Sequence, residues 1–459
     1  MQPGQRLNTF FTLLPLESYM STTPERGISE VAIRSQVQQA SALPPSRIQK
    51  LENGAVHRWY RFVLAYPDHY VRGQARDFGL HKDAVLLDPF VGCGTTCVEA
   101  KFLGIPAIGV DAHPFFVFAS HVKTTWDLDK EEVQAQRRAV LEELKDTFVA
   151  RSSLELGPKE AKSVVAGVDY PGLVTAEYVS PLPLAKCLAL RKRIEMVQPR
   201  ETRDLLRLAL ATTFVTSANV DFGPEIGLTK PKTDAAVFET FRRRSAEMLE
   251  DLQKLDPTLA PPTTVLQGDS RELDKIESKS ITAIITSPPY PVDKDYTRQV
   301  RLESAFLDFV ASLEESRAVK EQMVRASTRQ IYASDSETER VLDVPEVVDI
   351  MDEIVRRARA DGDTSGFVKQ YPRLVGEYFG GMSLHLEAAY RVLKRGGKAA
   401  YVVGDSQSFK RVRIETAKIL GKLSKRAGFH VTDIQLWRDR RSTAHAEPLP
   451  ENVLILRKP

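Results

Sequence analysis

Residues 85–111 read VLLDPFVGCGTTCVEAKFLGIPAIGVD and decide the fold class. The apolar run 85–90 predicts a buried strand, the glycine turn VGCGTT follows it, and a helix is expected to run to about Leu103. Residues 106–110 predict a second strand, which ends at Asp111. A strand, a glycine turn, a helix and a second strand that ends in an acid are typical of one half of a doubly wound α/β domain.

The stretch ITAIITSPPY, residues 281–290, predicts another buried strand with an abrupt end. Its β-branched run favours a strand in a parallel sheet, and the two prolines stop the hydrogen-bond ladder. Ligands of open α/β sheets bind at the carboxyl ends of strands, where this rigid corner is expected to lie. A hydroxyl, two proline-locked carbonyls and an aromatic ring suit the amino edge of a nucleobase. Taken alone, the same residues also fit a plain proline-rich turn.

Further strands are expected at 263–269, at 399–405 and over the last thirty residues, so the sheet resumes after long helical stretches. We therefore expect an α/β fold: a doubly wound, Rossmann-like sheet, mostly parallel with an antiparallel last strand, that carries an inserted helical lobe. The expected divisions are an N-terminal arm (1–45), a first core part (46–123), the helical lobe (124–260), a core part with the proline corner (261–307), a second insertion (308–372) and a C-terminal core part (373–459).

The composition is ordinary for a globular chain of 459 residues, with 42% hydrophobic and 27% charged residues. The net charge of +3 does not by itself point to nucleic acid. The three cysteines (Cys93, Cys97, Cys187) show neither a disulfide pattern nor zinc-site spacing, so we expect a reducing compartment and no metal. Because no apolar run could span a membrane and the first residues lack a signal-peptide pattern, a cytoplasmic protein is expected.

The glycine turn is a candidate ligand cradle. Gly92 and Gly94 would allow close approach to the backbone, and Thr95 and Thr96 would line the start of the helix. A dinucleotide is disfavoured because Cys97 stands where the G-x-G-x-x-G fingerprint needs its third glycine.

Three acids end successive predicted strands and suit different parts of one ligand. Asp88 is placed to accept from an ammonium group, Asp111 to accept from both hydroxyls of a ribose, and Asp269 to accept from an adenine amino group. Each acid alone is equally well explained as a helix cap. Their joint order favours S-adenosylmethionine, which has a cationic amino acid, a ribose and an adenine.

These residues resemble the amino-methylating family of DNA methyltransferases. Its cofactor loop has the form D-P-F-x-G-x-G-T-T, and its catalytic signature is Ser, Thr, Asn or Asp followed by Pro-Pro-Tyr. Residues 291–307 and 394–406 also look like later segments of the family. Residues 57–71, which include Trp59, Tyr60 and Tyr66, lie where the family has a motif that closes over the methionine end of the cofactor. The alternative interpretation of these three aromatic residues is that they form part of the core. The matching residues are Asp88, Pro89, Phe90, Gly92, Gly94, Thr95 and Thr96 in the loop and Ser287, Pro288, Pro289 and Tyr290 in the signature.

The cofactor loop precedes the signature here, whereas many members with the Ser form have the opposite order. Circular permutation of this kind preserves the site in three dimensions but leaves the target-recognition part unplaced.

The resemblance implies a site-specific enzyme that methylates an exocyclic amine of a base flipped out of double-stranded DNA. The Ser287 oxygen and the Pro288 carbonyl are the expected acceptors for the amine, and Tyr290 is expected to stack on the base. Serine at the first position favours cytosine N4 over adenine N6. Carbon-5 methylation is disfavoured because no cysteine stands in the expected context. A cognate restriction endonuclease is a candidate partner, and the oligomeric state stays open.

Two other functions fit the motifs: amino-methylation of RNA, and an inactive subunit that only binds DNA. Phosphate contacts are expected from residues 391–441, which hold fourteen Lys/Arg against four Asp/Glu, or from basic residues of 230–244 in the helical lobe, the favoured sequence reader. Tyr296 or Arg298, just after the proline corner, are candidates to brace the flipped strand.

Overall fold

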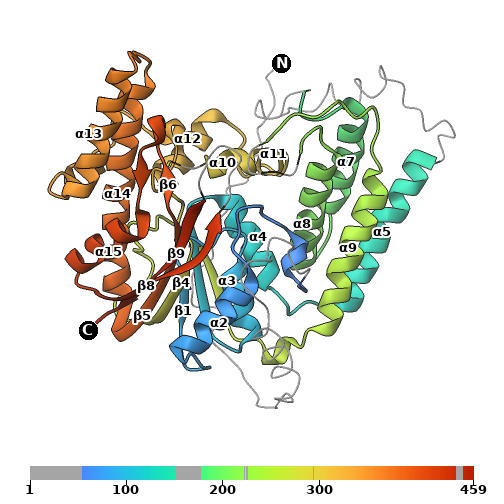
Figure 1. Ribbon diagram of the computed structural model, residues 1–459. Coiled ribbons are helices and arrows are strands. Elements are labelled where there is room, and N and C mark those ends of the chain that lie inside the picture. The colour runs from blue at the N-terminus through green and yellow to red at the C-terminus, as the bar shows by residue number, and fades with distance from the viewer. Residues whose placement is uncertain (1–53, 150–176, 222, 224–225, 293, 441–447) are drawn as a thin grey trace, which may run out of the picture.

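A seven-stranded sheet runs through the centre of the computed structural model, which describes residues 54–149, 177–221, 223, 226–292, 294–440 and 448–459 (Figure 1). The strand order is β3-β2-β1-β4-β5-β9-β8, and only β9 runs against its neighbours. The doubly wound, mostly parallel sheet with an antiparallel last strand is thus confirmed. The strands are β1 (Leu86–Asp88), β2 (Ala107–Asp111), β3 (Thr263–Gln267), β4 (Ile281–Thr286), β5 (Leu393–Gly404), β8 (His430–Arg440) and β9 (Leu449–Arg457), and β6 (Ser406–Gln407) pairs separately with β7 (Arg413–Ile414).

Both faces of the central strands are buried, which explains why their sequences read as continuous apolar runs. Successive side chains of a strand point to opposite faces. Leu86 accordingly packs in the core formed with α2 and α3, whereas Leu87 packs in the core formed with α14 and α15. These helices are α2 (Asp68–Phe78), α3 (Thr95–Phe102), α14 (Phe367–Val392) and α15 (Thr416–Arg426).

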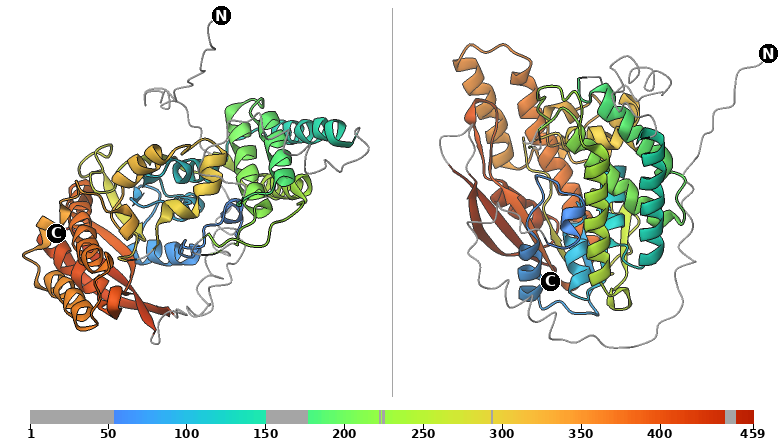
Figure 2. Two further views of the ribbon diagram at one scale, coloured as in Figure 1. Left: turned by 90° about the horizontal axis from the view of Figure 1, so that it is seen from above. Right: turned by 90° about the vertical axis from the view of Figure 1, so that its right-hand side faces the viewer.

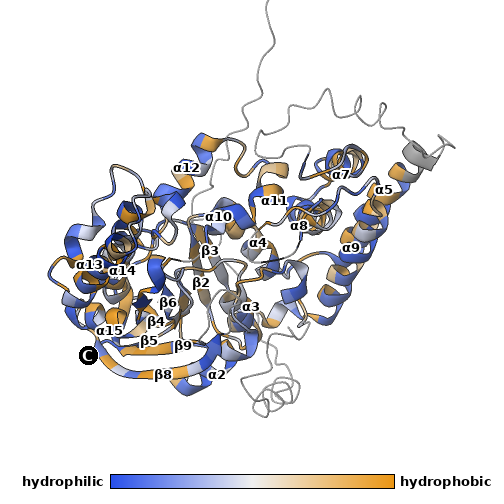
Figure 3. Ribbon diagram, turned by 45° about the horizontal axis from the view of Figure 1, so that its top comes forward, coloured by the Kyte–Doolittle hydropathy of each residue, from blue (hydrophilic) through white to orange (hydrophobic). Residues whose placement is uncertain are grey.

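A group of long helices stands at one side of the sheet, opposite α13 to α15 (Figures 1 and 2). Hydrophobic and hydrophilic residues alternate around these helices, as expected for amphipathic helices that share a core (Figure 3). Phe115 and Phe118 of α4 belong to the same core as Leu205 of α8, so the helices are anchored to the sheet domain through α4. The group comprises α5 (Lys130–Val149), α7 (Pro181–Ile194), α8 (Arg200–Ser217) and α9 (Val237–Lys254), and α4 (Pro114–Thr124) lies between it and the sheet.

The second interruption of the sheet is also helical. Short helices follow β4 and lead into α13, which packs along α14. The elements are α10 (Tyr296–Gln299), α11 (Arg301–Phe306), α12 (Leu313–Glu321), α13 (Pro345–Ala360) and the 3-10 turns η5 (Thr328–Gln330) and η6 (Glu337–Val341). Three further 3-10 turns are η3 (His57–Trp59), η4 (Pro257–Leu259) and η7 (Phe409–Arg411).

The structure departs from the sequence expectation in the length of one strand. The strand expected at 399–405 begins at Leu393. The predicted arm 1–45 lies outside the described residues, and the proposed domain boundaries stay predictions. Among the described helices, none is both long and apolar enough to cross a bilayer.

Candidate active site

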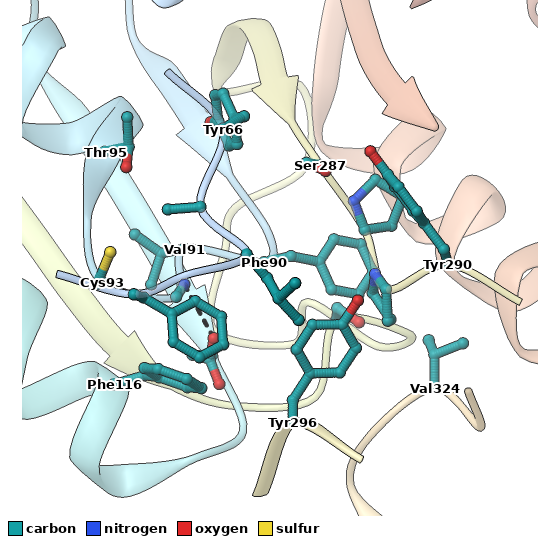
Figure 4. A pocket seen from close by; sticks show the side chains of 18 of the residues that line it. Tyr66, Phe90, Val91, Cys93, Thr95, Phe116, Ser287, Tyr290, Tyr296 and Val324 are labelled. Atoms are coloured by element: carbon teal, nitrogen blue, oxygen red, sulfur yellow. Dashed lines mark hydrogen bonds between the residues drawn. The ribbon is translucent and has the colours of Figure 1, made fainter. Parts of the chain in front are cut away.

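The carboxyl ends of β1, β2 and β4 border one cavity of about 280 Å³. β1 and β4 are parallel neighbours, with Leu86 opposite Ala283, so the segments that leave them meet at the same edge of the sheet. In Figure 4, Phe90, Val91 and Thr95 lie on one side of this cavity and Ser287 and Tyr290 on the other. The cofactor loop and the proline corner, far apart in the sequence, therefore face a common space.

The proline corner is fastened from two sides. The Ser287 hydroxyl donates to the Val402 carbonyl of β5 at 3.2 Å, and Tyr378 of α14 donates to the Pro289 carbonyl at 2.9 Å. A serine has one hydrogen to donate, so the lone pairs of the Ser287 oxygen are left to accept. No described residue donates to the Pro288 carbonyl. The corner thus presents two fixed acceptors at the cavity wall.

Tyr290 is held at both its ring and its hydroxyl. The hydroxyl donates to Glu451 of β9 at 2.5 Å, and the Arg440 guanidinium of β8 lies 4.8 Å from the ring centroid. Arg438 pairs with the same Glu451 carboxylate. Burial and the Glu451 charge raise the pKa of Tyr290 well above its ordinary value, so the phenol stays neutral. Strands β8 and β9 thereby set the orientation of this ring.

The glycine turn adopts a backbone that favours glycine, with φ of 49° at Gly92 and 87° at Gly94. A Cβ at Gly94 would lie 3.0 Å from the Ser120 Oγ of α4. That hydroxyl donates to the Gly92 carbonyl at 2.6 Å, and Lys123 donates to the Cys93 carbonyl at 2.7 Å. Helix α4 therefore supports the turn from behind and keeps its backbone against the cavity.

Asp88 binds the turn to the rest of the site. Its carboxylate accepts from Thr286 and Thr96 at 2.6 Å each and from the Phe90 amide and the Tyr66 hydroxyl at 3.1 Å each. A carboxylate has about four lone-pair sites, so these donors saturate it. Asp88 is only 1% exposed and lies behind the cavity wall. Its observed partners are protein groups, and its contact with a ligand ammonium stays a prediction.

Phe90 is positioned by a buried histidine. Its ring centroid lies 4.8 Å from that of His385, whose Nδ1 lies 2.8 Å from the Ser270 carbonyl. A carbonyl only accepts, so Nδ1 carries the proton and Nε2 accepts from Tyr401 at 2.9 Å. Burial lowers the pKa of His385 to about 4, which keeps the ring neutral.

Asp111 lines the cavity at the end of β2. One oxygen accepts from the Gly92 amide at 3.0 Å and the other from the His113 amide at 2.8 Å. Each oxygen keeps a free lone pair, which suits a pair of neighbouring hydroxyls. Burial raises the pKa of Asp111 to about 7.

Asp269 lies beside the cavity, and its neighbour Ser270 lines it. The Arg271 guanidinium pairs with Asp269 at 2.6 Å and the Arg271 amide donates to it at 2.8 Å. Its acceptance of an adenine amino group stays a prediction. Of the other predicted residues, those lining the cavity are Pro89, Phe90, Gly92, Thr95, Ser287, Pro288, Pro289 and Tyr290, whereas Gly94 and Thr96 support it from behind.

Several lining residues were not among the predicted site residues. Residues 62–66 form one wall, and they belong to the segment 57–71 that the resemblance placed near the methionine end; Tyr66 also donates to Asp88. The position of this segment before the first strand was the signal in the sequence that could have identified this wall. Trp59 and Tyr60 of the same segment are buried in a core, as the alternative interpretation expected. Arg438 and Glu451 come from the last two strands, and no local pattern marks them.

The mostly parallel seven-stranded sheet, with helices on both faces, is consistent with a Rossmann-like methyltransferase fold. No family model matches the chain. It is similar to the type II methyltransferase M.BsoBI of Geobacillus stearothermophilus, with 23% identity over 438 residues, 89% of this chain and 86% of the relative. It is also similar to the type II methyltransferase M.AvaI of Nostoc sp., with 28% identity over 169 residues, 35% of this chain and 33% of the relative.

A further match is the type II methyltransferase M.MjaII of Methanocaldococcus jannaschii, with 36% identity over 63 residues, 14% of this chain and 11% of the relative. Together with the two motifs, these similarities support a DNA methyltransferase, and the amino-methylating type is consistent with them. Methyltransferase relatives imply the use of S-adenosylmethionine and a DNA substrate in general terms.

Proposed function

We propose that this protein transfers a methyl group from S-adenosylmethionine to the N4 amine of a cytosine flipped out of double-stranded DNA. The observation that carries the proposal is the shared cavity, because a methyl donor and its acceptor must occupy one space. Adenine N6 is the alternative acceptor. A cognate restriction endonuclease is a proposed partner, by analogy with the type II names of the relatives.

The lining residues fit the proposed cofactor. The free lone pairs of Asp111 suit the two ribose hydroxyls, and the glycine turn lets the ligand lie against backbone. When bound, S-adenosylmethionine supplies an electrophilic methyl group on a sulfonium. Phe62, Phe90 and Phe116 line the same cavity and exclude water from that group.

The proline corner would activate the target amine. The lone pair of an exocyclic amine is delocalised into its ring, which makes the nitrogen a poor nucleophile. Hydrogen bonds from both amino hydrogens to Ser287 Oγ and the Pro288 carbonyl would favour a pyramidal nitrogen with a more available lone pair. Because Val402 holds the Ser287 hydroxyl and Tyr378 holds the adjoining Pro289 carbonyl, the corner need not reorganise during the reaction.

The choice of cytosine rests on Ser287. An uncharged acceptor can serve either amine, so the serine favours N4 only modestly. Flipping follows from the position of the corner inside a cavity, since an amine within a stacked duplex could not reach it. Tyr290, clamped by Glu451 and Arg440, offers a fixed ring edge or face to the flipped base.

Methyl transfer from labelled S-adenosylmethionine tests the proposal. The protein is incubated with unmodified duplex DNA, with total tRNA or with no nucleic acid, and the labelled acceptor is digested to nucleosides. We expect label in DNA as N4-methylcytosine. Label in N6-methyladenine would overturn the choice of base, label in tRNA alone would overturn the choice of DNA, and label in neither would favour an inactive DNA-binding subunit.

Cofactor binding should weaken as the pH falls through about 7. Only the charged Asp111 carboxylate can accept from both ribose hydroxyls, and burial raises its pKa to about 7. Affinity is therefore full above this pH, and below it proton uptake competes with the ligand and lowers affinity by up to about tenfold per pH unit. Calorimetric titration with S-adenosylhomocysteine across this range measures the effect. Asp111→Asn should bind more weakly at alkaline pH and lose this pH dependence. An unchanged profile in the variant would contradict the role of Asp111.

A further inference from the structure

A second cavity, of about 210 Å³, lies beside the active site. Most of its lining residues belong to α10, α11, α12 and η5 or lie beside them, in the segment that follows the proline corner, and His113 before α4 completes the lining. Its polar lining is unusually rich in hydrogen-bond donors. The donors are Arg298, Arg301, Ser304, Ser316, Lys320 and Arg329.

The three arginines of this cavity are not neutralised. Arg298 and Arg329 form no ion pair or side-chain hydrogen bond with a described residue. Arg301 stacks on Tyr178 at 4.5 Å, yet its Nε and Nη2 are buried without a hydrogen-bond partner, as is the Ser304 hydroxyl. Arg298 is half-buried and Arg329 is exposed, so water can serve their guanidinium groups. The buried Arg301 and Ser304 groups without acceptors are costly, which suits them to an acceptor that enters the cavity.

The charge of the cavity is positive after its internal pairing is counted. Among its described lining residues, Asp295 is the one carboxylate, and Lys320 pairs with it at 2.7 Å. His113 accepts from the Phe115 amide at 3.2 Å through Nδ1, and burial lowers its pKa to about 4. The neutral ring must then carry its proton on Nε2, which adds another donor.

The basic residues that the sequence predicted to bind DNA differ from these arginines, because several of them form ion pairs within the protein. In the run 391–441, Lys410 pairs with Asp363 at 2.9 Å and Arg426 pairs with Asp343 at 3.0 Å. In the helical lobe, Arg242 and Arg243 pair with glutamates of their own helix α9. Much of the charge that the sequence offers for phosphates is thus already satisfied within the protein.

The two cavities share a wall. Tyr296 lines the active site, whereas its neighbours Asp295 and Thr297 line the basic cavity. The chain also passes from one cavity to the other at the end of α12, where Lys320 lines the basic cavity and residues 322–324 line the active site. Neighbouring residues of the same two segments therefore line both cavities, so the basic cavity lies directly beside the active site.

We propose that the basic cavity binds a backbone phosphate of the DNA strand next to the flipped base. Guanidinium groups bind phosphate oxygens bidentately, and the Ser304 hydroxyl adds a third donor. Such a contact fixes the register of the strand and carries no sequence information. The proposal rests on the proposed DNA methylation and goes beyond it by naming the phosphate site.

Replacement of Arg301 by glutamine tests this site through kinetics and salt dependence. Arg301→Gln should raise the KM for duplex DNA about tenfold, and the slope of log KM against log salt should fall by about one, as for one lost phosphate contact. Binding of S-adenosylhomocysteine should be unchanged. Arg298→Gln should behave alike, and the matched control Arg356→Gln, an exposed residue of α13 paired with Glu353, should match the parent.

The outcomes separate the two proposals. A parent protein that labels no DNA removes the proposed function and this site with it. A parent that labels DNA, combined with an Arg301→Gln variant of unchanged KM and salt slope, overturns the phosphate site alone. Thermal stabilisation of the parent but not of the variant by inorganic phosphate, again with unchanged KM, would assign the cavity to a free anion instead and equally overturn it.

Discussion

A Ser287→Ala variant should transfer methyl groups at least about 100-fold more slowly than the parent on the same DNA, as for the loss of one preorganised catalytic hydrogen-bond partner. The variant loses one of the two proposed acceptors for the target amine, while the Pro288 carbonyl, the other proposed acceptor, is unchanged. No bond of Ser287 supports the cofactor loop, so affinity for S-adenosylhomocysteine should stay unchanged. Single-turnover methyl transfer and calorimetric titration measure the two quantities separately.

Two further variants sharpen this result. Ser287→Asn keeps an oxygen acceptor at the corner and should recover part of the lost rate. Ser278→Ala removes an exposed hydroxyl from the loop before β4 and should leave the rate unchanged. Full turnover by Ser287→Ala would show that the serine does not act on the amine.

An Asp88→Ala variant should lose at least about 3 kcal/mol of unfolding free energy, since each donor left unpaired in the interior costs roughly 1–3 kcal/mol. Four donors from β4, α3, the cofactor loop and the 62–66 wall converge on this carboxylate. The loop should also lose its anchor, so the affinity for S-adenosylhomocysteine should fall together with stability. Urea unfolding and calorimetric titration measure both effects.

The matched control is Asp83→Ala, because the Asp83 side chain is 75% exposed and lies just before the same strand. Its unfolding free energy should differ from the parent by less than about 0.5 kcal/mol, as is usual for surface substitutions. A stable Asp88→Ala variant that binds no cofactor would instead assign Asp88 to direct contact with the ligand, as the sequence suggested.

The sheet could be predicted because its signals are local. Residues 85–90 and 281–286 are apolar throughout, since the strands are buried on both faces, and turns rich in glycine and proline mark their ends. The two motifs could be placed at strand ends for the same reason. That they share one cavity followed only from the pairing of β1 with β4.

The partners of charged residues could not be predicted. The sequence marks 391–441 as basic and 335–363 as acidic, but it does not show that Arg426 reaches Asp343. It likewise offers Asp88 as a ligand group, whereas packing surrounds the carboxylate with four protein donors. Such pairings depend on contacts between distant segments, which hydrophobic period and turn chemistry do not report.

The strand and turn pattern and the two motifs could be predicted from the sequence, because these features depend on neighbouring residues along the chain. Tertiary structure alone decided which acids remain available to a ligand, which arginines remain unpaired beside the active site, and that Glu451 and Arg440 hold Tyr290. Burial and hydrogen bonding of a polar group are set by its neighbours in space, and these come from segments as far apart along the chain as Asp88 and Thr286, 198 residues.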